Sequence, residues 1–425
     1  MNRLERLVYD SVKRDPRVKR VIRDTYQRVC DLVPVPRQQL PAGTVVREGF
    51  FFGFHDKCPW SATDEYLLAH RVLIPLRMPG PDDVVGVGFF SGEDWLQFTP
   101  LATTRAWNWH QGAMLQWVGK SAYVLFNDYD GKRHLARVVD LRGRVQAVLP
   151  VPIAALSPDG RRGVSYDFAR LRGSPYAYAY ANGEDPEQDK LVATSHGLSL
   201  VDVQSGVQQL LFSVADIAQI QPEPSMRGAF HYFTHCQFSP SGARVKFFHR
   251  WLQNGYVRWT RMVGYDLQSG DLWVAPTSGM VSHVAWRDDD YILAYARTRE
   301  LDDGYYLFRY GTDDFEPVAR TTLTSDGHPS FSRDGRWILT DTYPDRWRAR
   351  HLILYDTQTN KRLEVGSFYS PRAYVGRTLR DILSCDLHPR WNRANTVASV
   401  DSAHTGTRSL CTVPVRHLLV AEERG

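Results

Sequence analysis

The chain has 425 residues, of which 43% are hydrophobic, 23% charged and 12% aromatic. Such a composition supplies a large buried core and excludes an intrinsically disordered chain. The net charge of +5 arises within residues 1–37, which hold ten Lys and Arg against five acidic residues, so the remaining 42 basic and 42 acidic residues cancel. This neutral body argues against nucleic acid as a partner, because nucleic-acid binding needs a basic face that displaces counterions.

The sequence shows neither a membrane-spanning segment nor a cysteine framework. No run approaches the length of about 18 apolar residues that a transmembrane helix needs. The cysteines are odd in number and lack CxxC spacing, which argues against a disulfide scaffold or a structural zinc site; they are Cys30, Cys58, Cys236, Cys385 and Cys411. Charges run through the N-terminal segment, so it does not resemble a secretory signal. We therefore expect a reduced, cytoplasmic protein, with the inner membrane face as an alternative location.

Residues 1–33 are predicted to form a basic, amphipathic helical arm that is kinked or broken near Pro16. Its apolar stripe comprises Leu4, Leu7, Val8, Val12, Val18, Val21, Ile22, Val29 and Leu32. Residues 34–43, PVPRQQLPAG, follow as a proline-rich linker. We expect the stripe to pack on the body or on a second subunit, because surface helices usually bury their apolar stripe in protein. The alternative is peripheral binding to an anionic membrane surface.

After the linker, one format repeats along the chain: an apolar strand, a tight polar turn and a second strand rich in β-branched and aromatic residues. Clear copies lie at 58–70, 154–166, 236–248, 284–296, 329–341 and 389–400, and a weaker copy lies at 114–126. The turn SPDG at 157–160 suits a type I turn, because proline presets φ, aspartate accepts a local hydrogen bond and glycine tolerates positive φ.

Seven such hairpins, each followed by one or two further strands, predict an all-β fold, a seven-bladed β-propeller with four-stranded antiparallel blades over residues 44–420. We expect blades to start near residues 50, 106, 151, 230, 281, 326 and 384, with an insertion in blade three at 167–200. The aromatic residues before the turns are expected to fill the space between adjacent sheets; they are Trp60, Trp117, Phe238, Trp286, Phe331 and Trp391.

Histidine recurs at one phase of this repeat. His235, His283, His328 and His388 each lie four residues before a turn, while blade one offers His55 and Lys57 and blade two offers His110. The inner strands of a propeller surround its axis, so equivalent positions converge although they are far apart in sequence. A convergent ring of imidazoles predicts a metal site or an acid–base site. The alternative is that each histidine only ties down its own turn by hydrogen bonding.

Residues 230–420 resemble the oligogalacturonate lyases, cytoplasmic seven-bladed propellers related to the TolB repeats. The resemblance rests on HCQFSPSGARVKFFHRW (235–251), SHVAWRDDDYILAY (282–295), GHPSFSRDGRWILTD (327–341) and LHPRWNRANTVASVDSAHTG (387–406). It implies β-elimination on an acidic, uronic-acid-containing oligo- or polysaccharide. It also implies His283 as the base, Arg258 as a catalytic or substrate-binding arginine, and His328 and His388 as ligands of a divalent cation such as Mn²⁺ or Ca²⁺.

The sequence departs from the family pattern around the last blade, where a glutamine and a histidine of the metal site are replaced by Cys385 and Arg390. Arg390 is expected to supply fixed positive charge to the substrate carboxylate in place of the cation. Proton abstraction at C5 of a uronate needs that carboxylate neutralised and a base with a pKa near the working pH, for which histidine and arginine are suited.

The predicted site therefore combines three sets of residues. The catalytic set is His283, Arg258, His110, Tyr166 and Arg170; the substrate-binding set is His55, Lys57, Gln111, Asn127, His235 and Arg390; the metal set is His328 and His388. For Tyr166 and Arg170 the alternatives are a tyrosine at a blade edge and a solvated arginine.

Several functions remain open at this stage. A uronate C5-epimerase shares the first step with a lyase, and a non-catalytic propeller that binds glycan or protein in polysaccharide assembly is a different class of function. Glycoside hydrolysis needs two opposed carboxylates, and the candidate residues do not recur at one phase; they are Asp56, Asp128, Asp167, Asp341 and Asp401. The sequence has no nucleophile elbow and no phosphate-binding P-loop.

Overall fold

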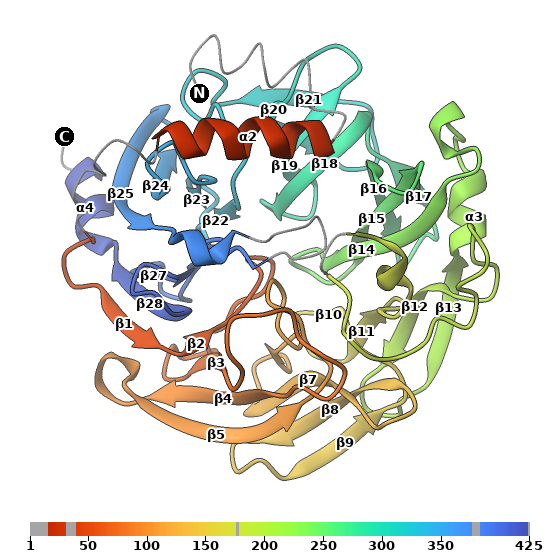
Figure 1. Ribbon diagram of the computed structural model, residues 1–425, viewed down its shortest axis with the longest axis horizontal. Helices are drawn as coiled ribbons and strands as arrows, with labels where there is room; N and C mark the ends of the chain where they lie inside the picture. Colours follow the sequence, from red (N-terminus) through yellow and green to blue (C-terminus); the bar gives the residue numbers. More distant parts are fainter. Residues whose placement is uncertain (1–15, 31–39, 176–177, 376–382, 424–425) are drawn as a thin grey trace.

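The computed structural model describes residues 16–30, 40–175, 178–375 and 383–423. Seven four-stranded antiparallel sheets surround one axis (Figure 1), which confirms the predicted seven-bladed propeller. All five cysteines are free thiols. None of the helices within the described residues is long and apolar enough to span a membrane.

The first three blades follow the chain in order, each strand pairing with the next. Blade one comprises β2 (Phe50–Phe51), β3 (Leu67–Arg71), β4 (Val85–Ser91) and β5 (Gln97–Thr104). Blade two comprises β6 (Gln116–Trp117), β7 (Tyr123–Tyr129), β8 (His134–Asp140) and β9 (Val145–Leu149). Blade three comprises β10 (Ala155–Leu156), β11 (Arg162–Ser165), β12 (Gly197–Asp202) and β13 (Gln208–Ser213), and its long β11–β12 connection contains most of the predicted insertion.

The next three blades repeat the same order. Blade four comprises β14 (Phe230–Phe238), β15 (Arg244–Gln253), β16 (Val257–Asp266) and β17 (Leu272–Val274). Blade five comprises β18 (Thr277–Trp286), β19 (Tyr291–Thr298), β20 (Gly304–Arg309) and β21 (Phe315–Val318). Blade six comprises β22 (Ser330–Phe331), β23 (Trp337–Asp341), β24 (Ala349–Asp356) and β25 (Lys361–Tyr369).

Blade seven joins the two ends of the chain. The C-terminal strands β26 (Arg390–Trp391), β27 (Val397–Ser402) and β28 (Ser409–Pro414) form its inner part, and β1 (Val45–Glu48) is its outer strand. Val46 pairs with Cys411 and Arg47 with Leu410 in the antiparallel register. The ring is therefore closed by hydrogen bonds between residues more than 350 positions apart, a closure that the repeat itself did not reveal.

The repeated turns have the chemistry that their sequence predicts. In the turn between β10 and β11, Gly160 has φ +74° and its N–H donates to the carbonyl of Ser157 at 2.8 Å. The Ser157 hydroxyl donates to the carboxylate of Asp159 at 2.5 Å. Two of the aromatic residues before these turns bridge blades, since the Trp117 indole donates to the carbonyl of Pro59 in blade one and the Trp391 indole to the carbonyl of Ser330 in blade six.

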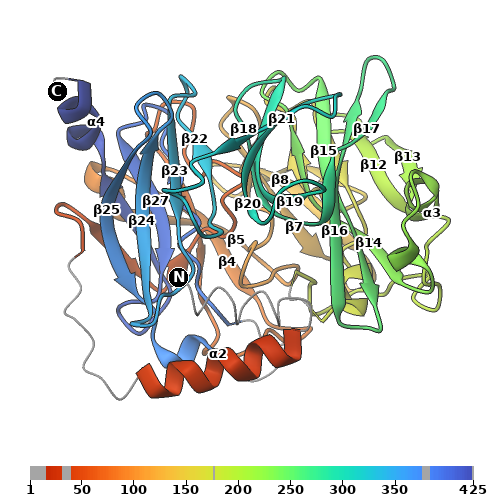
Figure 2. The same ribbon diagram turned by 90° about the horizontal axis from the view of Figure 1, so that it is seen from above.

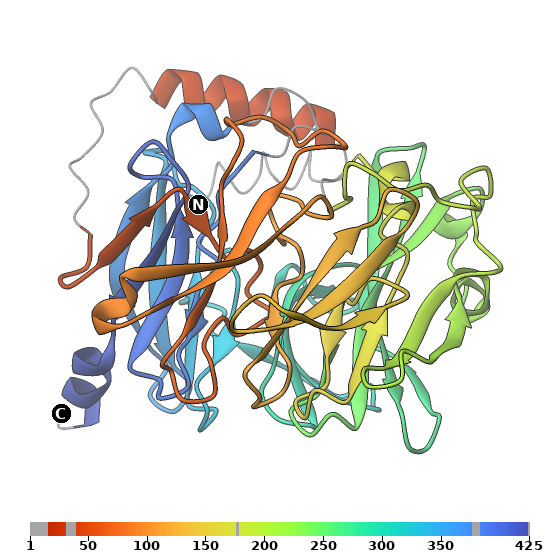
Figure 3. The same cartoon turned by 90° about the horizontal axis from the view of Figure 1, so that it is seen from below.

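The two ends of the ring carry different elements. The connections that lead into the inner strands lie at the same end as the turns β3–β4 (72–84), β15–β16 (254–256) and β23–β24 (342–348), because successive strands of a blade alternate in direction. Helix α2 (Pro16–Cys30) lies across this end, which we call the α2 face, and α4 (Arg416–Glu423) lies on the opposite side of the ring (Figures 2 and 3).

The short helices lie in connections. They are α3 (Val214–Gln219), with a capping box at Ser213 and Asp216, and the 3₁₀ turns η1 (Glu93–Trp95), η2 (Arg170–Gly173), η3 (Pro224–Met226) and η4 (Arg372–Tyr374). Of the predicted arm 1–33 and linker 34–43, residues 1–15 and 31–39 lie outside the described residues. In the described part the arm is helical, but its apolar stripe does not pack on the propeller, since Val21 is 66% and Val29 62% exposed.

Candidate active site

The ring of Phe54 lies at the centre of a cluster of imidazoles that come from four different blades. Its centroid lies 4.9 Å from the rings of His235 and His388, 5.9 Å from that of His283 and 6.0 Å from that of His328. His283 and His328 are 4.0 Å apart, and His328 and His388 are 4.3 Å apart. The predicted convergence of these four histidines is therefore confirmed.

A loop of blade one places Phe54 and His55 in this cluster. The N–H groups of Phe52 and Gly53 donate to the carboxylate of Asp401, at 2.9 and 2.7 Å. The His55 ring lies 5.3 Å from that of His328, and its Nδ1 is 2.9 Å from the carbonyl of Pro329. His55 thus joins the cluster as its fifth imidazole, with a pKa that burial and then the neighbouring imidazoles of His328 and His283 hold well below the ordinary value.

Two of the central histidines are held by carboxylates. Nδ1 of His283 donates to Asp326 at 3.0 Å, and Nδ1 of His328 lies 2.8 and 3.0 Å from the two oxygens of Asp341. Asp341 also accepts hydrogen bonds from the N–H groups of His328 and His388. These contacts fix the rings and direct Nε2 of His283 and His328 away from their carboxylates.

The two carboxylate-bound histidines differ in basicity. Burial lowers the pKa of His283 below its ordinary value, and Asp326 only partly opposes this effect. Burial alone would lower the pKa of His328 as well, but the adjoining carboxylate of Asp341 raises it above the ordinary value. The pair therefore offers a neutral imidazole beside one that holds a proton more firmly, which are the states required of a base and an acid.

A second group, His110, Asp386 and His388, has the geometry of a cation site. Nδ1 of His110 and Nε2 of His388 lie 3.8 and 4.0 Å from a carboxylate oxygen of Asp386, and the three candidate ligand atoms lie within 4.8 Å of one another. All three residues are buried. His388 Nε2 has no hydrogen-bond partner among the described residues, so its lone pair is available to coordinate a cation.

The protonation states of this group favour a cation. Burial lowers the pKa of His110 to about 4 and holds that of His388 well below the ordinary value. Burial opposes ionisation of Asp386, but Arg350, whose guanidinium lies 2.5 Å away, holds the pKa of Asp386 below its ordinary value. Two neutral imidazoles and a carboxylate are ligands for a divalent metal ion. His328, which was predicted to be a ligand, faces Asp341 and is not part of the group.

Two arginines near the cluster were not expected from the sequence. Arg250 of β15 is 3% exposed, and its Nε and Nη1 have no hydrogen-bond partner among the described residues. Burial and the nearby Arg258 lower its pKa to about 10. Arg250 in turn contributes to the depressed pKa of His235. Arg350 of β24 is likewise buried, and its Nε is unbonded within the described chain. A buried guanidinium group with unbonded N–H donors, such as that of Arg250, favours an anion nearby.

The remaining predicted residues around the cluster are placed as follows. Gln111 is buried beside Gly53, and neither atom of its amide is bonded within the described residues. Lys57 forms an ion pair of 2.9 Å with Asp56. Tyr166 is buried with its ring stacked on Phe168, and burial raises the pKa of its hydroxyl well above the ordinary value, so it is a weak proton donor.

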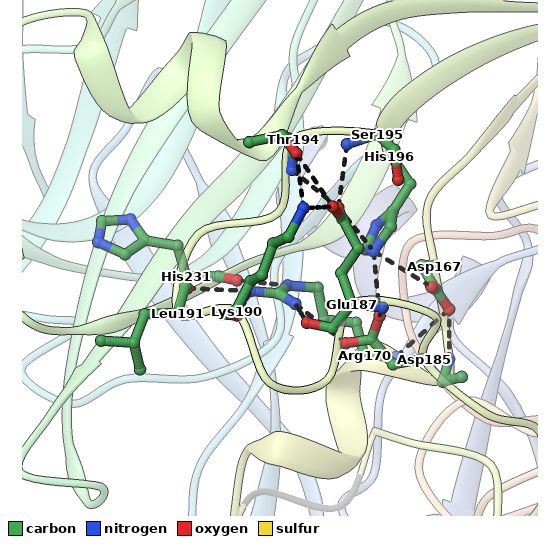
Figure 4. Close-up of polar contacts among 11 residues, drawn as sticks. Asp167, Arg170, Asp185, Glu187, Lys190, Leu191, Thr194, Ser195, His196 and His231 are labelled. Carbon is green, nitrogen blue, oxygen red and sulfur yellow. Dashed lines mark hydrogen bonds and ion pairs between the residues drawn. The ribbon is translucent and has the colours of Figure 1, made fainter.

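Arg170 is not available for catalysis. Its guanidinium donates to Asp185 and to the carbonyls of Glu187, Lys190, Leu191 and His231 (Figure 4). It also lies over the Phe230 ring, 4.4 Å from its centroid. Asp185 also accepts from His196 at 3.0 Å, and Glu187 accepts from the N–H groups of Thr194 and Ser195. Arg170 therefore anchors the insertion of blade three.

Two other predicted binding residues are also structural. The Arg390 guanidinium donates to the carbonyl of Gly53 at 2.7 Å and lies 3.3 Å from Asp401, so it holds the loop of Phe54 rather than a substrate carboxylate. The Asn127 side chain bonds to the backbone of Ile153 and to the Tyr180 hydroxyl, and so ties blade two to blade three.

The cluster is connected to the α2 face through Tyr343 of the β23–β24 turn. The Tyr343 ring lies 5.8 Å from that of His328 and 6.3 Å from that of His283, and the residue is 44% exposed. Tyr178 of the blade-three insertion lies 4.8 Å from His235 on the other side of the cluster. Two tyrosines from connecting segments thus border the imidazoles.

Some site residues that were not predicted from the sequence nevertheless stand at informative positions in it. Asp386 and Asp326 each precede a predicted histidine by two positions, which in an extended segment puts both side chains on one face. Arg250 directly follows His249 within the HRW motif. Arg350 and Tyr343 carried no signal, because their relation to the cluster depends on contacts between blades six and seven and on the course of one turn.

Comparison with known proteins bears on the fold. No protein-family model matches the sequence, and no curated protein matches it at a significant level. An oligogalacturonate lyase solved in complex with manganese superposes with a TM-score of 0.60 over 90% of this chain and 96% of that chain, at 13% sequence identity. The oligogalacturonate lyase of Vibrio parahaemolyticus gives a TM-score of 0.59 over 90% and 97% of the two chains, at 12% identity. The chain therefore has the seven-bladed propeller fold of these lyases.

Proposed function

We propose that the protein abstracts the C5 proton of a uronic acid residue in an acidic oligo- or polysaccharide and eliminates the substituent at C4. The observation that carries this proposal is the pairing of His283–Asp326 with His328–Asp341, whose imidazoles lie 4.0 Å apart in the buried cluster. Arg250, whose Nε and Nη1 have no hydrogen-bond partner within the described residues, lies beside His235 of the same cluster. The similarity of fold to oligogalacturonate lyases supports the same chemistry.

His283 is assigned as the base. Its Nδ1 proton is donated to Asp326, which fixes the tautomer and leaves Nε2 with a free lone pair. The depressed pKa keeps the ring neutral at ordinary pH. When Nε2 takes the C5 proton, the developing imidazolium is stabilised by the carboxylate of Asp326.

His328 is assigned as the acid. The electron pair of the broken C5–H bond forms the C4–C5 double bond while the C4–O bond breaks, and the leaving oxygen takes the proton that the Asp341-bound imidazole holds. One proton is gained by His283 and one is given by His328, so the net charge of the pair does not change, and each ring returns to its starting protonation state by exchange with solvent. An epimerase would instead return the proton to the opposite face of C5.

Arg250, with Arg258 nearby, is assigned to the substrate carboxylate. The C5 proton becomes acidic only when the negative charge of that carboxylate is balanced, and a planar guanidinium grips a carboxylate with two parallel hydrogen bonds. Nε and Nη1 of Arg250, which have no hydrogen-bond partner within the described part of the chain, are available for such contacts. A divalent cation held by His110, Asp386 and His388 would supply further positive charge to balance the same carboxylate.

The test is a screen of purified protein against uronate polymers and oligomers, with the ultraviolet absorbance of the conjugated product as readout. Activity should fall by about a hundredfold or more in His283→Gln, by the usual contribution of a general base. His417→Gln, an exposed histidine on α4, is the matched control and should keep full activity.

Other outcomes identify the alternatives. Exchange of C5 hydrogen for deuterium without absorbance would show an epimerase. Binding of a uronate glycan with neither reaction, and with no effect of His283→Gln, would overturn the assignment of an enzyme and favour a binding platform.

A further inference from the structure

Helix α2 rests on the propeller through its polar side. Nε2 of Gln27 donates to the carbonyl of Arg346 at 2.9 Å, and the Arg17 guanidinium lies 4.2 Å from the centroid of the Tyr256 ring. These contacts attach the helix to turns of blade six and blade four. Arg20 and Asp24, which lie on the same side, form an ion pair of 3.6 Å with side chains only 18% and 34% exposed.

The apolar side of α2 faces away from the described part of the propeller. Val21 is 66% exposed, Val29 62% and Ile22 36%. At 3.6 residues per turn these three positions fall on one arc of the helix, opposite Gln27. A surface helix normally buries such a stripe in its own protein, so the reversed orientation indicates an external apolar partner.

The charge of the arm indicates which partner. Helix α2 contains five Lys and Arg and one acidic residue, and residues 1–37 carry the whole net charge of the chain. Basic residues beside an exposed apolar stripe are typical of helices that lie in the interface of an anionic bilayer, with the stripe among the acyl chains and the cations at the headgroups. A second copy of the same basic helix would be repelled by like charge.

Other exposed apolar side chains share the α2 face. Leu73 of the β3–β4 turn is 47% exposed, Tyr343 of the β23–β24 turn 44%, and Val375, in the connection from β25 to β26, 40%. The strand order puts the connections that carry all three at the end of the ring that α2 crosses; Figure 2 shows α2 across this end. These side chains add apolar surface to the end of the ring on which α2 rests.

We propose that α2 docks the α2 face of the propeller on an anionic phospholipid surface. Docking through this face turns the connections that lead into the inner strands, and Tyr343 beside the histidine cluster, toward the membrane. The inference does not depend on the reaction proposed above, because it rests on the exposed stripe and the charge of the arm alone.

The test is flotation of the full chain with phosphatidylglycerol-containing vesicles and with pure phosphatidylcholine vesicles. We expect binding to the anionic vesicles, weak binding to the neutral ones, and loss of binding as salt shortens the Debye length from about 10 Å to about 3 Å. The double variant Val21→Glu/Val29→Glu should reduce the partition coefficient at least tenfold. Val207→Glu is the matched control, since Val207 is also 66% exposed but lies in the β12–β13 turn at the opposite end of the ring.

Three results would overturn the proposal. These are absence of binding to anionic vesicles, equal binding to both vesicle types, and binding by the double variant at the level of the wild type. A concentration-dependent dimer that the double variant abolishes, without vesicle binding, would assign the stripe to a second copy of the chain instead. Thermal unfolding of both variants checks that the propeller is intact, which is expected because each substitution is at an exposed position.

Discussion

Asp326 and His283, which belong to neighbouring blades, are joined by a hydrogen bond of 3.0 Å between a carboxylate oxygen and Nδ1. The carboxylate is partly exposed, with 19% of its side chain accessible, whereas the imidazole is 6% exposed. The contact couples the orientation of the imidazole to the packing of blade six against blade five. It also makes the basicity of His283 adjustable by a single substitution.

Replacement of this carboxylate should change both rate and pH dependence. Asp326 raises the pKa of His283 against the effect of burial, so Asp326→Asn should lower that pKa further. The acid limb of the kcat/KM profile should then move to lower pH, while kcat falls by about tenfold to a hundredfold because the tautomer is no longer fixed. A pH–rate profile of both proteins checks this, and an unshifted acid limb would contradict the role of His283 as base.

The group of His110, Asp386 and His388 should bind one divalent cation per chain. Titration calorimetry with Mn²⁺ on metal-free protein should show a single site, and Asp386→Asn should weaken it at least tenfold by removing the only carboxylate of the group.

A second set of residues serves as the control for this measurement. Asp167, Asp185 and His196 also lie close together, but Asp185 already accepts hydrogen bonds from Arg170 and His196. His196→Gln should leave the affinity for Mn²⁺ unchanged. If His196→Gln abolished binding and Asp386→Asn did not, the cation would belong to the blade-three insertion.

Arg170 should be important for stability. Arg170→Met leaves the buried carboxylate of Asp185 without its cation and removes hydrogen bonds to four backbone carbonyls. The free energy of unfolding should fall by about 3 kcal/mol or more, as for other broken buried ion pairs. Arg172→Met is the control, since Arg172 is exposed and, among the described residues, its guanidinium makes one hydrogen bond, to the carbonyl of Gly183; its cost should stay below about 1 kcal/mol.

Acid should destabilise the protein through its buried imidazoles. Burial lowers the pKa of His70 to about 3, and its Nε2 accepts the N–H of Ala113 at 3.0 Å. The unfolded chain takes up a proton near pH 6.5 while the folded state does not, so the stability that the neutral ring provides is lost as pH falls from 6.5 toward 3. Between pH 6.5 and 5 the loss from His70 should be about 2 kcal/mol.

Denaturant titrations at these two pH values test the sign. His70→Gln should reduce the loss of stability between them. His351 should behave in the opposite sense, because Asp345 and Glu364 raise its pKa, so its contribution is present in acid and is lost as pH rises above the ordinary value. If His70→Gln leaves the pH dependence of stability as steep as in the wild type, His70 does not cause the loss of stability in acid.

The features that the sequence revealed are those that repeat. Each blade encodes its own hairpin in local turn chemistry, so the number of blades and the convergence of His235, His283, His328 and His388 followed from the period alone. The partners of charged side chains did not follow, because a lone arginine is equally compatible with a substrate, an ion pair or a carbonyl. Arg170 and Arg390 were assigned to the site for this reason, while Arg250 was overlooked.

The arm is a second case in which the sequence predicted an element but not its contacts. Its periodicity predicted an amphipathic helix, and α2 is one. Which side of the helix contacts the propeller depends on Tyr256 and the carbonyl of Arg346, which are 239 and 319 residues away from their partners in α2. The cytoplasmic location stays a prediction.

The pairing of β1 with β28 in blade seven has a consequence for biosynthesis. Residues 45–48 are made long before their pairing partners at 409–412. Until β28 has been synthesised the ring stays open, with an unpaired strand edge on each side of the gap. Messages that terminate early would therefore yield products with exposed strand edges, which are prone to aggregate.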